Sequence, residues 1–202
     1  MTQNPRTLNL FLVLAARRKL FLLKTCSRTV LLRAAGLGFL NPFLYYTVLF
    51  AAYDLLPAQE AQPLNYTWAI TLSLLSVPLL GQPLRLREVF AIFVSYSGVV
   101  VIATRGNLAA LSFTNVPGVL LALGSTVIWA LYWTYNTRDP NDPTLGLFLN
   151  FVFGFPFILA ACLAFSEPLP GSFPGMAGAL YVGVFEMGIT FVFWLQALKR
   201  SI

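Results

Sequence analysis

The stretch YVGVFEMGITFVFW, residues 181–194, decides the class of this protein. Thirteen of its 14 residues are uncharged and most are apolar, yet Glu186 lies near its middle. A helix needs about 20 residues, at a rise of 1.5 Å each, to cross a bilayer core of about 30 Å. The run between Glu167 and Lys199, in which Glu186 is the one charged residue, is long enough to do so. The stretch therefore predicts a membrane helix that carries a carboxylate.

The rest of the chain has the same character. Of its 202 residues, 58% are hydrophobic and 10% are charged, whereas soluble domains are about 25% charged. Mean hydropathy is +0.76. Charged residues bracket uncharged runs that predict six spans, near residues 34–53, 62–81, 88–104, 117–136, 144–166 and 176–198, with part of another helix at 8–16. The predicted fold class is an all-α, polytopic transmembrane helical bundle.

The composition argues against most catalytic chemistry. The chain has no His, and Cys26 and Cys162 are far apart. Zinc sites and His-based nucleophiles are therefore unsupported, and we expect no metal, no cofactor and no enzyme. The 13 basic residues against 7 acidic ones indicate loop orientation rather than nucleic-acid binding.

The basic residues also predict an orientation. If the six spans alternate, 11 of the 13 basic residues fall on one face. The positive-inside rule then puts this face in the cytoplasm, for a multi-pass protein of the inner (plasma) membrane.

Two helices resemble each other in opposite orientations. GFLNPFLYYTVLFAAYD (38–54) aligns with GVFEMGITFVFWLQALK (183–199) at a constant offset of 145, which matches Asn41 with Glu186. The first copy ends in Asp54 and the second in basic residues. The two copies are five positions apart in the order of the spans, so they cross the membrane in opposite directions. This pattern predicts an inverted repeat, as in secondary transporters whose substrate site lies where the repeats meet.

Three further stretches carry a family resemblance. NYTWAITLSLLSVPLLGQPLRLREVFAIFVSYSGVVVIAT (65–104) resembles the end of the first repeat of EamA-type transporters, in the drug/metabolite transporter superfamily. GVLLALGSTVIWALYWTY (118–135) resembles the opening helix of the second repeat. FLYYTVLFAAYDLLPAQEAQPLNYTW (43–68) is similar to the branch that contains aromatic amino-acid exporters.

The resemblance implies ten helices in two inverted five-helix repeats. Residues 1–107 would form the C-terminal part of the first repeat, and residues 108–202 the N-terminal part of the second. By that comparison the first helix and the last two are absent from this chain.

Glu186 is the first candidate site residue. A charge near the bilayer centre costs at least ~2.5 kcal/mol, so we expect it to face protein or water. It could couple transport to protons, contact an amino group of the substrate, or remain a neutral acid bonded to a neighbouring helix. Thr190, four residues on, shares its helical face.

The other candidates lie on three further helices. Trp129, Tyr132 and Trp133 form one stripe, which predicts either an aromatic wall for a flat substrate or ordinary packing. Asn41 and Tyr45 flank Pro42, which predicts an interrupted helix of the kind that transporters use at their sites. Asn65 could cap its helix or face a cavity, while Trp68 is favoured as an interface anchor.

The predicted function is transport, as an exporter of small metabolites such as amino acids or related amphipathic compounds, by alternating access of the two repeats. The expected partners are a small-molecule substrate and the lipid bilayer, with a homodimer as an open alternative and no nucleic acid. Two other classes stay open: a non-transporting membrane assembly partner and a polytopic membrane enzyme.

Overall fold

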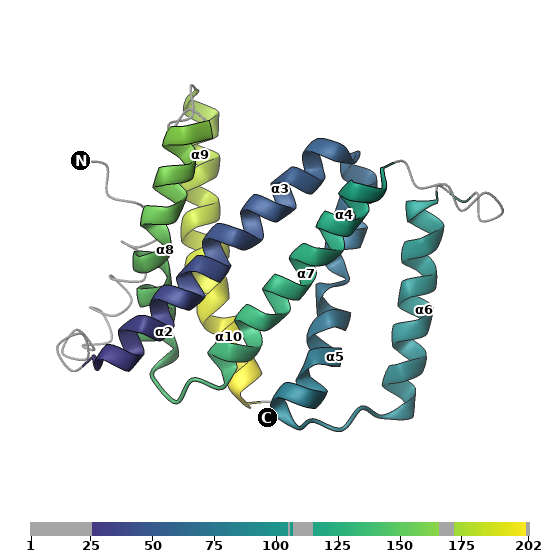
Figure 1. Ribbon diagram of the computed structural model, residues 1–202, viewed down its shortest axis with the longest axis horizontal. Helices are drawn as coiled ribbons and strands as arrows, with labels where there is room; N and C mark the ends of the chain where they lie inside the picture. Colours follow the sequence, from purple (N-terminus) through teal and green to yellow (C-terminus); the bar gives the residue numbers. More distant parts are fainter. Residues whose placement is uncertain (1–25, 105, 107–114, 166–171, 201–202) are drawn as a thin grey trace. The chain divides into compact units, whose positions relative to one another are not determined.

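The computed structural model describes residues 26–104, 106, 115–165 and 172–200. All regular secondary structure in these residues is helical, which confirms the all-α class (Figure 1). The partial helix expected at 8–16 lies outside the described residues, as does most of the basic segment that follows it.

Four helical stretches are long and apolar enough to cross a membrane, judged by length and composition within the described residues. They are Arg28–Leu55, Val116–Thr137, Pro143–Phe165 and Phe173–Arg200. The chain is thus a polytopic helical membrane protein. The remaining two predicted spans, 62–81 and 88–104, correspond to a divided helix and to an 18-residue helix.

The described residues fall into two compact units. Unit 1 contains the described parts of Met1–Phe43 and Tyr135–Ile202, and unit 2 is Leu44–Thr134. The units do not follow the two predicted repeats, because each unit draws helices from both halves of the sequence. The repeat boundaries at 107 and 108 therefore stay a prediction.

Unit 1 is built on a close contact between α2 (Arg28–Gly38) and α8 (Pro143–Phe165). A Cβ atom on Gly38 would lie 2.4 Å from the Asn150 carbonyl oxygen, and one on Gly154 would lie 2.7 Å from the Gly38 carbonyl oxygen. Only glycine permits this approach of two backbones, the packing that small residues give in membranes. The helices α9 (Phe173–Tyr181) and α10 (Phe191–Arg200) complete the unit, and α10 also packs on α8.

Unit 2 contains α3 (Tyr45–Leu55), α4 (Ala58–Tyr66), α5 (Trp68–Leu80), α6 (Leu86–Ala103) and most of α7 (Val116–Thr137). Its core cluster joins α3, α4 and α7 through six buried residues: Ala52, Leu56, Ala61, Leu64, Val119 and Ala122. Helix α4 also contacts α6, which exposes Leu86, Phe90 and Phe93. Large exposed apolar side chains of this kind suit a helix that faces lipid.

The expectation of one helix over 62–81 is wrong in detail, because α4 ends at Tyr66 and α5 begins at Trp68. Thr67 lies between them with φ −65° and ψ −5°, and its hydroxyl donates a 2.7 Å hydrogen bond to the Leu64 carbonyl. The Leu64 carbonyl thus accepts from both the hydroxyl and the backbone N–H of Thr67, which closes the end of α4.

Two other spans are irregular near their middles. In the segment η2 (Phe39–Leu44), Asn41 is extended, with φ −148° and ψ 123°, immediately before Pro42. This break agrees with the interrupted helix predicted from Pro42. In the last span, α9 passes into the π-helical segment η3 (Val182–Thr190), which precedes α10 and contains Glu186.

Candidate functional site

Unit 2 brings three polar side chains together from three helices. The Tyr45 hydroxyl of α3 lies 3.2 Å from Asn65 Nδ2 and 3.3 Å from Asn65 Oδ1 on α4. The same Nδ2 donates to Ser125 Oγ of α7 at 3.2 Å, and Ser125 donates onward to the Ala122 carbonyl at 2.7 Å. All three side chains are buried, so each hydrogen bond stabilises a group that would otherwise lose its solvation.

Aromatic rings cover this polar centre. The Trp129 ring lies 4.4 Å from the Tyr45 ring and 6.2 Å from the Trp68 ring, between their centroids. Trp68 begins α5 three residues after Asn65, so the division of the helix at Thr67 brings it to Trp129. We call Tyr45, Asn65, Trp68, Ser125 and Trp129 the aromatic–amide cluster.

Burial separates Trp68 and the rings of the predicted wall into two kinds. Trp129 and Trp68 are partly exposed, whereas Tyr132 and Trp133 are completely buried. The Trp133 ring lies 5.6 Å from the Trp129 ring and 5.2 Å from the Tyr132 ring, so Trp129 packs on a buried ring that itself packs on another. Trp129 and Trp68 are therefore the two indole rings with surface left to contact a ligand.

The aromatic–amide cluster offers a specific chemistry. Indole and phenol rings provide flat apolar surface and the negative faces that attract cations, while an amide and two hydroxyls can donate or accept hydrogen bonds. Such a combination suits an amphipathic molecule with an aromatic or aliphatic part and a polar end. Sequence reasoning favoured Trp68 as an interface anchor; its position three residues after Asn65 was the signal that it could join the site.

Asn41 belongs to unit 1, at the break in η2. Its side chain is 0% exposed, and neither amide atom has a hydrogen-bond partner within the part of the chain that the structure describes. Pro42 has no N–H to donate to the Gly38 carbonyl one turn earlier, so the regular i to i−4 hydrogen bond is missing at this break. In the same unit Asn150 donates a 2.9 Å hydrogen bond to Asn136, which joins the end of α7 to α8.

Glu186 and Thr190 also belong to unit 1, and both side chains are exposed. The Thr190 hydroxyl donates to the Phe185 carbonyl at 2.8 Å, five residues earlier, in keeping with the wider turn of η3. Tyr181, Phe185 and Phe193 are exposed on the same span.

One acidic residue behaves differently from the expectation. Glu60 falls between the predicted spans 34–53 and 62–81, but it lies in the first turn of α4 and is 4% exposed. Its burial could not be foreseen, because α4 begins four residues earlier than the predicted helix. Among the described residues, no three His, Cys, Asp or Glu side chains come together as a metal site would require.

The sequence profile of the EamA-like transporter family matches residues 7–104 and again residues 116–201. The first match includes α2 to α6, and the second includes α7 to α10.

Two curated proteins show the relationship in detail. An aromatic amino acid exporter, YddG, from Ancylobacter novellus is 32% identical over 172 residues, which cover 82% of this chain and 58% of the relative. An uncharacterized transporter from Archaeoglobus fulgidus is 27% identical over 121 residues, 57% of this chain and 41% of that protein. The chain thus spans about half of the length of these relatives. No solved structure matches it.

Proposed function

Because this chain belongs to the EamA-like transporter family, we propose that its protein exports amino acids or related amphipathic metabolites across the inner membrane. Transport would proceed by alternating access, in which two inverted repeats expose a central site to each side in turn. Family membership points to a transporter and away from the membrane enzyme that the sequence left open. The name of the Ancylobacter relative supports export and an aromatic substrate.

The aromatic–amide cluster is the observation that carries this proposal. Trp129 and Trp68 would contact the apolar part of the substrate, and Tyr45 and Asn65 would bind its polar end. Tyr132 and Trp133 would hold the Trp129 ring in position. This arrangement suits an aromatic amino acid, whose ring needs apolar surroundings and whose amino and carboxylate groups need polar ones.

The two irregular segments give independent support. The alignment offset of 145 carries η2, residues 39–44, onto residues 184–189, which lie inside η3. Transporters built from inverted repeats interrupt their helices at corresponding places near the site. Asn41 and Glu186 occupy these matched places, so we assign them to substrate or proton binding, with Thr190 beside Glu186.

The orientation of the protein in the membrane is proposed from its basic residues. Arg33, Asp139 and Lys199 lie at one end of unit 1, as expected if the spans alternate. We assign this end to the cytoplasm by the positive-inside rule. The homodimer stays a prediction that crosslinking in vesicles can test.

The experiment is uptake into proteoliposomes that contain the full-length gene product. The substrates are labelled aromatic amino acids, aliphatic amino acids and hydrophobic amines, with and without a proton gradient. The proposal expects saturable transport of the aromatic amino acids. A folded, membrane-inserted protein that moves none of these compounds would contradict it and favour the assembly partner.

Glu186→Gln tests the role of the acid in the same vesicles. We expect the variant to lose the acceleration of transport by a proton gradient, because the amide cannot exchange a proton. Asp54→Asn, which removes an exposed acid at the end of another span, is the matched control and should retain the acceleration. Equal acceleration in both variants would remove Glu186 from the coupling mechanism.

A further inference from the structure

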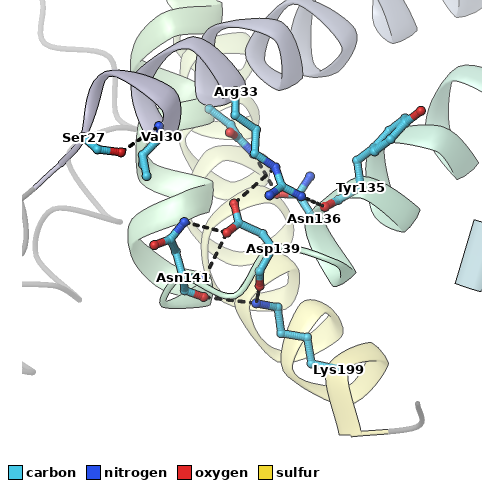
Figure 2. A network of polar contacts seen from close by, with 9 residues as sticks. Ser27, Val30, Arg33, Tyr135, Asn136, Asp139, Asn141 and Lys199 are labelled. Atoms are coloured by element: carbon cyan, nitrogen blue, oxygen red, sulfur yellow. Dashed lines mark hydrogen bonds and ion pairs between the residues drawn. The ribbon is translucent and has the colours of Figure 1, made fainter.

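A polar network at one end of unit 1 joins three segments that are far apart in the sequence (Figure 2). The Arg33 Nη2 of α2 donates a 2.7 Å hydrogen bond to the Tyr135 carbonyl, and its Nε lies 3.6 Å from Asp139 Oδ2. Lys199 of α10 donates from Nζ to the carbonyls of Asp139 and Asn141. Asp139 Oδ1 accepts from the Asn141 backbone N–H at 2.9 Å and from its side chain at 2.6 Å.

Each bond has a physical reason. Helix α7 ends at Thr137, so the Tyr135 carbonyl is one of the last four, which have no partner inside the helix. A cation at this end also interacts favourably with the helix dipole. Arg33 and Lys199 therefore satisfy carbonyl groups at and beyond the end of α7, and Asp139 holds the connecting loop in the conformation that presents them.

The members of this network come from different repeats. Arg33 lies in the first family match, residues 7–104, while Tyr135, Asp139, Asn141 and Lys199 lie in the second, residues 116–201. The contacts of Lys199 stay within the second match. The contacts of Arg33 cross from one match to the other, so relative motion of the two repeats at this end must break them.

The closest backbone contact of α2 with α8 lies nearby on the same helix. Gly38 packs against Asn150 and Gly154 and has no room for a side chain. Arg33 is five residues from Gly38, or about 7.5 Å along the axis. A tilt of α2 by about 15° around Gly38, similar to known subunit rotations, would move Arg33 by about 2 Å. That displacement is enough to break a 2.7 Å hydrogen bond.

We propose that the contacts of Arg33 with Asp139 and Tyr135 form a gate between the repeats that closes the basic end of the protein. The Gly38–Gly154 contact is the pivot around which α2 tilts when this gate opens. The inference rests on the proposed transport function, since a gate has its use in alternating access. The ion pair is partly exposed, so it biases the equilibrium between open and closed states without locking it.

The test measures access to a buried position beside the gate. Thr144 lies in the first turn of α8, is 1% exposed, and its hydroxyl has no hydrogen-bond partner among the described residues. Thr144→Cys is therefore a mild reporter, placed in full-length protein that also carries Cys26→Ser and Cys162→Ser. A membrane-impermeant maleimide is applied to vesicles from the basic side, and the rate of modification is recorded.

Arg33→Gln should raise the modification rate about two- to fivefold, the effect of losing an ion pair of modest strength. Arg28→Gln is the matched control, because it removes the same charge from an exposed position on the same helix, and it should leave the rate unchanged. If Arg33→Gln aggregates, Asp139→Asn carries the same expectation.

Equal rates for Arg33→Gln and Arg28→Gln would overturn the gate. Transport is measured on the same preparations to separate the two proposals. A reporter that responds in a protein without transport would leave the gate standing and contradict the proposed function. If the parent transports substrate but the reporter does not respond to Arg33→Gln, the proposed function stands and the gate is contradicted.

Discussion

Asn65 is the residue on which the polar part of the aromatic–amide cluster depends. Replacement by Leu would leave the buried Tyr45 and Ser125 hydroxyls without their shared partner, at a cost of about 1–3 kcal/mol. We therefore expect Asn65→Leu to lower the unfolding midpoint of the purified protein clearly, in a thermal scan.

Gln62 provides the matched control on the same helix. Its side chain also accepts a hydrogen bond from a tyrosine, the Tyr53 hydroxyl at 2.9 Å, but it is exposed. Gln62→Leu should cost well under ~1 kcal/mol because water can replace the lost partner. Equal losses for the two variants would mean that the hydrogen bonds of Asn65 do not stabilise the cluster.

Gly38 is the second residue with a sharp expectation. A methyl group there would lie 2.4 Å from the Asn150 carbonyl oxygen, whereas one on Gly36 of the same helix meets nothing within 4 Å. Gly38→Ala should destabilise the protein by about 1–3 kcal/mol through overpacking, while Gly36→Ala should be neutral or stabilising. A thermal midpoint for Gly38→Ala at or above that of Gly36→Ala would refute the close contact of α2 with α8.

At this scale the sequence could not predict which polar side chains are buried. Glu186 was expected to face protein or water and is exposed, while Glu60, between two predicted spans, is buried. The face that a side chain occupies depends on which helices pack beside it, and those contacts are not encoded in the spacing along one helix.

Among the elements, α5 and α7 are joined by a hydrogen bond between two hydroxyls. Thr71 Oγ1 and Thr126 Oγ1 lie 3.0 Å apart in unit 2. Such bonds between membrane helices contribute about 0.6 kcal/mol on average. A double-mutant cycle with Thr71→Val and Thr126→Val should give a coupling free energy of about 0.5 kcal/mol in unfolding measurements.

Ser97 gives the control for this cycle, because its hydroxyl donates to the Phe93 carbonyl of its own helix at 2.9 Å. Ser97→Ala and Thr126→Val should be additive. Coupling as large in this control pair as in the Thr71–Thr126 pair would show that the cycle reports a general loosening instead of the hydrogen bond.

The elements also show what sequence reasoning could and could not reach. The break at Asn41 was predicted because Pro42 removes a helix hydrogen bond, which is a local effect. The division at Thr67 was missed because a threonine ends a helix only when its side chain and its tertiary surroundings favour it. The π-helical turn at η3 has no comparable signal in composition.

At the scale of the molecule, the composition was sufficient to predict the class, an all-α bundle of membrane helices. Long uncharged runs leave few alternatives to membrane helices, and the order of the motifs indicated the family that the profile match then showed. The two compact units were not predictable, since each combines helices from both matches. Motion of one repeat against the other must therefore shear contacts within each unit, as proposed for α2 against α8.

Binding of a labelled aromatic amino acid to the full-length protein in lipid nanodiscs tests the central claim most directly. We expect Trp129→Ala to weaken binding about tenfold, since aromatic contacts contribute about 0.5–1.5 kcal/mol beyond burial. Phe90→Ala, which removes an exposed ring of α6 in the same unit, should bind like the parent. A folded Trp129→Ala variant with undiminished affinity would contradict the assignment of the aromatic–amide cluster as the substrate site.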